Sequence, residues 1–209
     1  MHNPPRVLLL GIGNVLWADE GFGVRAVEEL ARRYRFPDAV RLLDGGTQGI
    51  YLVDQVRAAD VLVVFDAVDY GLPPGTLKRV EGDEVPRFLG AKKMSLHQTG
   101  FQEVLALAAL LGDFPRRLLL IGVQPAELED YGGSLRPEVK ACIGPAIDLA
   151  LAYLAELGIR PEPLETPLAD LPDMPHAALS LERYESGRPS AELACRIGDP
   201  RVLAGCGDA

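Results

Sequence analysis

Short runs of consecutive apolar residues are the feature that most constrains the fold of this chain. Three of them, at Val7–Leu10, Val61–Phe65 and Leu118–Val123, consist almost entirely of aliphatic side chains. Strands that are buried on both faces have this composition, whereas half-exposed strands alternate apolar and polar residues. Segments with the period of amphipathic helices separate the runs. The sequence therefore predicts an α/β fold of three layers, with helices on both faces of a parallel or mixed sheet.

The other expected elements fit between these strands. We expect a second strand at Val40–Leu43 and an exposed strand at Thr76–Val80, and helices at Val24–Tyr34, Ile50–Ala58, Ser95–Leu111 and Pro137–Leu157. Ser95 has the spacing to Gln98 of an N-cap in a capping box, and Gly158 follows the last helix as a C-cap. If the order at the centre of the sheet is 2-1-3, the first and third strands in the chain are neighbours, and ligands bind at such a switch point.

The charge balance argues against several classes of partner. The net charge of −9 and the absence of a Lys or Arg cluster make nucleic acid an unsuitable ligand.

No apolar run approaches the length of a membrane span, and the N-terminus lacks the pattern of a signal peptide, so we expect a cytoplasmic protein without membrane association. The apolar content requires no interface, which favours a monomer. Cys142, Cys195 and Cys206 are widely spaced, and we expect reduced thiols.

The composition changes near residue 160. Prolines gather in residues 161–209, and no clear periodicity is present there. We therefore expect one α/β domain at residues 1–160 and a Pro-rich, extended or partly disordered C-terminal tail at residues 161–209.

Three possible metal ligands follow strands or open a helix at the same end of the expected sheet. Glu20 follows the first strand, Asp66 ends the Val61–Phe65 strand, and His97 lies at the start of a helix. Residues just past the carboxyl ends of parallel strands converge on one crevice. Two carboxylates and an imidazole form a suitable site for a divalent metal of borderline hardness.

Each of these residues also has a purely structural interpretation. A carboxylate such as Glu20 is favoured at the start of a helix, Asp66 could cap a loop, and His97 could be a surface histidine. The neighbouring Asp19 and Asp69 could replace Glu20 and Asp66 as ligands. The hypothesis depends on all three groups lying at one end of one sheet.

Two other kinds of site fit the sequence less well. The Gly11-Ile12-Gly13 turn resembles the start of a dinucleotide fingerprint, but Leu16 stands where the third glycine is required. A tight turn that brings the backbone close to a ligand or substrate is the better interpretation of these glycines. The chain also has no G-x-S-x-G nucleophile elbow, and Cys142 lies inside the last expected helix.

At these motifs the sequence resembles the hydrogenase maturation endopeptidases, which process the large subunit of nickel–iron hydrogenases. Six segments carry the resemblance, in order over about residues 6–158: Gly11-Ile12-Gly13-Asn14, Asp19-Glu20-Gly21-Phe22-Gly23-Val24, Asp44-Gly45-Gly46-Thr47, Asp66-Ala67, Ser95-Leu96-His97-Gln98 and Gly122-Val123-Gln124-Pro125. Asp130–Leu135 and the tail around Leu181–Glu185 are most similar to the branch that serves membrane-bound uptake hydrogenases.

The resemblance implies a fold, an activity and a partner. It implies a cytoplasmic protein with a twisted, mostly parallel, five-stranded sheet that removes a C-terminal extension from the large-subunit precursor after nickel insertion. The metal-contacting positions of the family fall on Glu20, Asp66 and His97. We expect the Ni²⁺ to be supplied by the precursor and to serve for recognition, and Asp66 or Glu20 to act as general base. A nickel-dependent chaperone without catalytic activity and a nucleotide-binding enzyme remain the alternatives.

Overall fold

The structure, a computed structural model, describes residues 4–88, 96–168 and 171–189, with the side chains of residues 87–88 and 96–99 outside this description. Its centre is a five-stranded sheet with the strand order β3-β1-β4-β6-β5. The strands are β1 (Val7–Ile12), β3 (Val40–Gly46), β4 (Val61–Ala67), β5 (Leu77–Glu81) and β6 (Arg117–Val123). All neighbours pair in parallel except β5, which runs antiparallel to β6. The mostly parallel sheet and the 2-1-3 order at its centre are thus confirmed.

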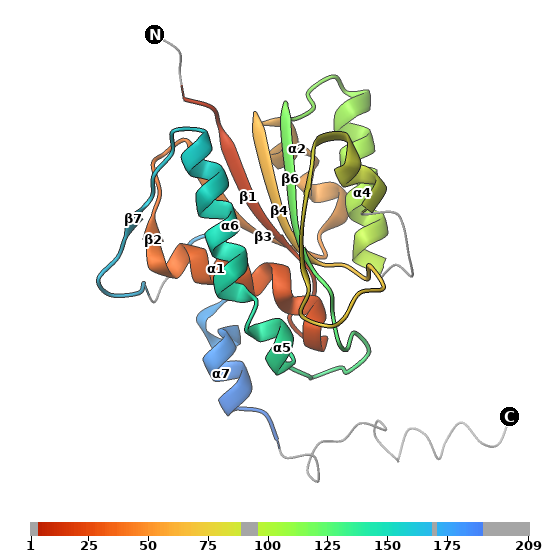
Figure 1. The fold of residues 1–209 in the computed structure, drawn as a ribbon, viewed down its shortest axis with the longest axis vertical. Helices are drawn as coiled ribbons and strands as arrows, with labels where there is room; N and C mark the ends of the chain where they lie inside the picture. Colours follow the sequence, from red (N-terminus) through yellow and green to blue (C-terminus); the bar gives the residue numbers. More distant parts are fainter. Residues whose placement is uncertain (1–3, 89–95, 169–170, 190–209) are drawn as a thin grey trace, which may run out of the picture.

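Helices cover both faces of this sheet (Figure 1). Helices α1 (Phe22–Arg33) and α6 (Ile143–Glu156) lie on one face, and α2 (Val53–Arg57) and α4 (Leu96–Leu110) lie on the other. Successive residues of β1 point to opposite faces: Leu9 packs in the core under α1 and α6, and Leu8 and Leu10 pack in the core under α2 and α4. Consecutive apolar residues are required because both faces of the strand are buried.

The helix expected from Pro137 onward is two helices in the structure. A short helix, α5 (Pro137–Lys140), is followed by a turn and then by α6. The physical reason is Pro145, which has no N–H and whose ring would collide with the carbonyl of Ala141 in a continuous helix. Gly158 ends α6 with a φ of 78°, as expected for a C-cap.

The expected helix at Ile50–Ala58 also has two parts, the 3-10 helix η2 (Gly49–Leu52) and α2. Three further short elements were not predicted: the 3-10 helices η1 (Ala18–Gly21) and η3 (Gly82–Glu84), and α3 (Val85–Phe88). The proposed N-cap Ser95 lies outside the described residues. Among the described residues, no helix is long and apolar enough to cross a lipid bilayer.

The region after residue 160 follows the surface of the α/β domain wherever the structure describes it. Strand β7 (Glu162–Pro163) pairs with β2 (Tyr34–Arg35) in a separate two-stranded sheet. It is followed by η4 (Ala177–Leu179) and α7 (Leu181–Ser186), which lacked a readable period in the sequence. The division into a domain at 1–160 and a tail at 161–209 stays a prediction, since residues 190–209 lie outside the described part.

Candidate functional site

Asp66 lies at the switch point of the sheet, near the carboxyl end of β4. It is fully buried, with 0% of its surface exposed, and it pairs in register with Gly122 of β6. Strand β1 runs along the other side of β4, with Gly11 opposite Phe65. The side chain therefore sits at the edge where the connections after β1, β4 and β6 leave the sheet, as the sequence predicted.

Glycines bring Glu20 to the same edge. Gly13 has a φ of 133°, and a Cβ atom built on it would lie 1.8 Å from the carbonyl oxygen of Glu20. A Cβ atom on Gly23 would lie 2.1 Å from the carbonyl oxygen of Phe65. Only glycine fits at both positions, so η1 and the start of α1 pack directly on the ends of β1 and β4.

The packing of the chain itself also requires glycine at positions 11 and 13, and the expectation that they bring the backbone close to a ligand stays a prediction. A Cβ atom on Gly11 would lie 2.4 Å from the carbonyl oxygen of Gly23, so the close neighbour is the backbone of this chain.

Asp19 has a structural role that separates it from Glu20. Its side chain is 0% exposed. One carboxylate oxygen accepts the N–H groups of Ala126 and Glu127, both at 2.8 Å, and the other accepts the N–H of Arg136 at 2.7 Å. Asp19 therefore ties η1 to the loop after β6, whereas Glu20 is only partly buried. Of the two carboxylates, Glu20 is the better placed to meet a ligand.

Asp69 likewise serves the loop after β4. Its Oδ1 accepts the N–H of Gly71 at 2.9 Å and the side-chain amide of Gln124 at 3.1 Å. The buried Gln124 also accepts the N–H groups of Tyr70 and Leu72, at 2.7 and 3.1 Å. Gln124, in the motif that begins at Gly122, thus shapes the loop that carries Tyr70.

Tyr70 is a residue of the site that the sequence analysis missed. Burial raises the pKa of its hydroxyl, and the nearby carboxylate of Asp66 raises this pKa further. A Cβ atom on Gly122 would lie 1.9 Å from the Tyr70 hydroxyl oxygen, so this glycine makes room for the ring. The ammonium of Lys78 lies 5.1 Å from the ring centroid. Because burial and Asp66 raise its pKa, the Tyr70 hydroxyl stays protonated at neutral pH.

His97 is the second residue of α4, but its side chain lies outside the described part of the structure. The backbone of α4 approaches η2 closely, since a Cβ atom on Gly100 would lie 3.5 Å from the Cα of Gly49. The described side chains, which do not include that of His97, contain no group of three His, Cys, Asp or Glu residues that could hold a metal ion. The set of Glu20, Asp66 and His97 as metal ligands stays a prediction.

Exposed apolar side chains lie on the connections that follow the strands at this end of the sheet. Each is at least a third exposed: Leu16 at 36%, Ile50 at 62%, Tyr51 at 83%, Leu72 at 40% and Tyr131 at 64%. The ring of Tyr131 packs edge-on against Trp17, with 5.3 Å between centroids. Residues of this kind at a functional edge are typical of a surface that binds another protein.

Comparison with known proteins points to one family. The family described as HycI, hydrogenase maturation protease, matches residues 24–153, which run from α1 into α6. The hydrogenase expression/formation protein HupD of Thiocapsa roseopersicina is 70% identical over 203 residues, covering 97% of this chain and 92% of that protein. The hydrogenase 2 maturation protease of Escherichia coli K12 is 44% identical over 161 residues, covering 77% and 97%. The structure of the hydrogenase-maturating endopeptidase HybD from E. coli superposes with a TM-score of 0.72 at 42% identity, covering 76% of this chain and 97% of that one.

Proposed function

This chain belongs to the hydrogenase maturation proteases and is a peptidase, and on that premise we propose that it removes the C-terminal extension of a nickel–iron hydrogenase large-subunit precursor after nickel insertion. The observation that carries the proposal is the placement of Asp66, a fully buried carboxylate at the switch point of the sheet, with η1 packed against the ends of β1 and β4. Two of the relatives cited are named as a hydrogenase maturation protease and a hydrogenase-maturating endopeptidase, and the third as a hydrogenase expression/formation protein.

Nickel in this proposal arrives with the precursor and is part of the substrate. Glu20, Asp66 and His97 would contact it, because carboxylate oxygens and an imidazole nitrogen suit an ion of borderline hardness. Recognition of the ion would restrict cleavage to a loaded precursor. When bound, the ion also supplies a Lewis acid for a scissile carbonyl.

The carboxylates of the chain itself account for proton transfer. Asp66 or Glu20 would act as general base toward the water that attacks the scissile peptide bond. The hydroxyl of Tyr70 keeps its proton, because burial and the Asp66 carboxylate raise its pKa, and it is therefore available as a hydrogen-bond donor. This aspartyl-type, metal-dependent chemistry distinguishes the proposal from a serine or cysteine mechanism.

The exposed apolar residues support a protein as substrate. Tyr51 and Tyr131 lie on connections after different strands, which gives a broad contact area around the carboxylates. We propose that the protein works as a monomer in the cytoplasm. Neither nucleic acid nor a membrane enters the proposal, because no cluster of cationic residues is available for phosphate groups.

The test is mass spectrometry of nickel-loaded and nickel-free precursor after incubation with the protein. Loss of a C-terminal peptide from the loaded form alone is expected. Cleavage of both forms would refute nickel recognition but keep the protease. If neither form is cleaved, although nickel loading is verified, the proposed processing is refuted and the alternative of a nickel-dependent chaperone is favoured. His97→Ala should weaken the response most at low nickel, and equal nickel dependence in variant and parent would argue against His97 as a ligand.

A further inference from the structure

Residues 171–188, here called the C-terminal strap, contact three separate parts of the α/β domain. Near its start, the carbonyl of Asp173 accepts the N–H of Asp44 in β3 at 2.8 Å. In its middle, the carbonyl of Leu179 accepts a hydrogen bond from Arg25 of α1 at 2.6 Å. Near its end, α7 lies beside α1 and α5 (Figure 1). The strap is thus held at several points along its length.

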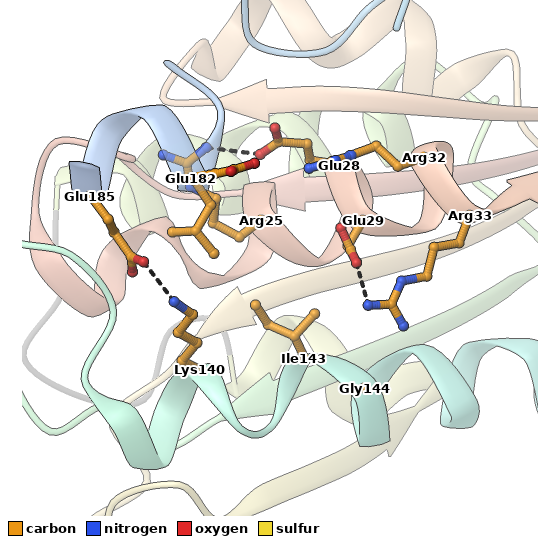
Figure 2. A pocket seen from close by; sticks show the side chains of 11 residues that line it. Arg25, Glu28, Glu29, Arg32, Arg33, Lys140, Ile143, Gly144, Glu182 and Glu185 are labelled. Atoms are coloured by element: carbon orange, nitrogen blue, oxygen red, sulfur yellow. Dashed lines mark hydrogen bonds and ion pairs between the residues drawn. The ribbon is translucent and has the colours of Figure 1, made fainter. Parts of the chain in front are cut away.

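Near its end the strap joins α7 to the loop before α5, and Arg188 after α7 also pairs with Asp130 of that loop at 3.4 Å. Glu185 accepts a hydrogen bond from the hydroxyl of Ser134 at 2.8 Å through one oxygen, and from the ammonium of Lys140 at 2.7 Å through the other. Figure 2 shows Lys140 and Glu185 facing each other across the gap between α5 and α7. Because both carboxylate oxygens are used, this single side chain fixes α7 to two consecutive segments.

The middle contact of the strap covers a buried ion pair. Arg25 and Glu28 are 3% and 5% exposed, and their charged groups are 2.8 Å apart. A buried pair offsets its desolvation cost only when further hydrogen bonds satisfy the charged groups. The strap supplies the carbonyl of Leu179 and the ring of Tyr184, whose centroid is 5.8 Å from the guanidinium carbon of Arg25. The start of α1 therefore depends on the strap for part of its packing.

The loop of residues 130–136, which Glu185 holds through Ser134, contacts the segment that carries Glu20. The N–H of Gly132 bonds to the carbonyl of Leu16 at 2.7 Å. The N–H of Arg136 bonds to the carboxylate of Asp19 at 2.7 Å. Tyr131 packs against Trp17, to which it is also joined by a β-bridge. A movement of this loop would therefore be transmitted to residues 16–20.

A cavity of about 420 Å³ lies beneath α7 and has Arg25, Lys140 and Glu185 in its wall (Figure 2). Asp66 and Glu20 do not line it. The contact between α7 and the domain therefore consists of a few specific polar bonds around an open space. Loss of one of these bonds cannot be compensated by close packing of the surrounding side chains.

We propose that the C-terminal strap positions Glu20 by holding the loop of residues 130–136 against η1, and that Glu185 is the positioning residue. The expected effect on cleavage rests on the proposed function, whereas the connection from the strap through the loop to η1 does not. A misplacement of about 1 Å at a reacting group can lower a rate roughly a hundredfold.

The test compares Glu185→Ala with Glu182→Ala in the full chain. Glu182 is an exposed residue of the same helix, so the two variants lose the same kind of side chain and differ in their contacts. Trp17 is the only tryptophan of the chain and lies at the end of the proposed link. Acrylamide quenching of its fluorescence in native buffer should rise in Glu185→Ala and stay at the parental value in Glu182→Ala.

Cleavage of the nickel-loaded precursor provides the second readout. Glu185→Ala should lower kcat roughly ten- to a hundredfold, because the loop no longer holds η1 and Glu20 in place. The double variant Glu185→Lys/Lys140→Glu should recover most of the activity. The reversed pair restores attraction between α5 and α7, and the Ser134 hydroxyl can accept a hydrogen bond as well as donate one.

Two results would overturn the proposal. Equal Trp17 quenching in the two alanine variants would show that Glu185 does not hold the loop. Raised quenching with an unchanged kcat would show that the loop does not position the site. If the parent protein cleaves no precursor, the proposed function is wrong, and the quenching comparison still decides whether the strap holds the loop.

Discussion

Two neighbouring carboxylates, Asp19 and Glu20, should respond in opposite ways to the same chemical change. Asp19 is 0% exposed and accepts three backbone N–H groups at 2.7–2.8 Å. Glu20 is partly buried in the same short helix, η1. Replacing each by its amide preserves shape and removes the charge. We expect Asp19→Asn to lose stability, and Glu20→Gln to lose activity.

The magnitude for Asp19→Asn follows from its three hydrogen bonds. The least costly orientation of the amide points its oxygen at Ala126 and Glu127 and its NH₂ group at the N–H of Arg136. One bond to a charged acceptor, about 1.5–3 kcal/mol, is then lost, and a buried N–H without a partner costs about 1–3 kcal/mol. Because these terms overlap, we expect a loss of about 2–4 kcal/mol. Glu20→Gln should change stability by less than about 0.5 kcal/mol.

Urea unfolding followed by circular dichroism measures the first effect, provided that both variants keep the parental slope. Cleavage of the nickel-loaded precursor measures the second. The reasoning is refuted if Asp19→Asn loses less than about 0.5 kcal/mol, or if Glu20→Gln is equally destabilised. Parental cleavage by Glu20→Gln would remove Glu20 from the site.

Three further outcomes are expected. Asp66→Asn should keep the circular dichroism spectrum of the parent and abolish cleavage, and parental cleavage by this variant would sink the proposed mechanism. Gly122→Ala should displace the ring of Tyr70, since its Cβ would lie 1.9 Å from the hydroxyl oxygen, and so slow cleavage; Gly144→Ala, where no described atom lies within 4 Å, should keep activity and stabilise α6 by about 0.5–1 kcal/mol. Equal effects of the two alanines on cleavage would contradict this account. Burial raises the pKa of Glu185, but the hydrogen bonds from Lys140 and Ser134 and the charges of Lys140 and Arg25 together lower it more, so the folded-state pKa lies below the ordinary value. The stability that the Glu185 carboxylate adds should therefore be present above about pH 4.3 and be lost as the pH falls through the folded-state pKa. The melting temperature should fall less steeply from pH 6 to pH 3 in Glu185→Gln than in the parent. Parallel curves would contradict the contribution of Glu185.

The sheet was predictable because its signal is local. Consecutive apolar residues such as Val61–Phe65 are typical of a strand buried on both faces. The order 2-1-3 was assumed from one of the common doubly wound arrangements, and only the structure establishes it. The break between α5 and α6 was missed, although Pro145 cannot lie in the interior of a continuous helix and so marks it. Helix α7 has only six residues, too few for a helical period to emerge from the sequence.

The candidate site was predictable only where strand ends determine it. Asp66 lies near the carboxyl end of β4 and Glu20 lies in η1 after β1, so the topology brings both to one edge. The role of Asp19 depends on N–H groups more than 100 residues later in the chain, at Ala126 and Glu127. No local pattern announces such a contact. Tyr70 was missed for the same reason, because Gln124 shapes its loop from another strand's end.

The hydrogen bond between Asp44 and Asp173 has a consequence for the purified protein as well as for its site. Strand β3 is an edge of the sheet, and edge strands offer unpaired backbone groups to other chains. The strap occupies one of these groups at 2.8 Å, and Asp173 also pairs with Arg41 of the same strand at 3.0 Å. A chain cut before residue 171 would therefore expose an aggregation-prone edge. A truncated chain could therefore lose activity either because it self-associates or because Glu20 is no longer positioned. Single substitutions on α7 leave the contact with β3 in place and so test positioning alone.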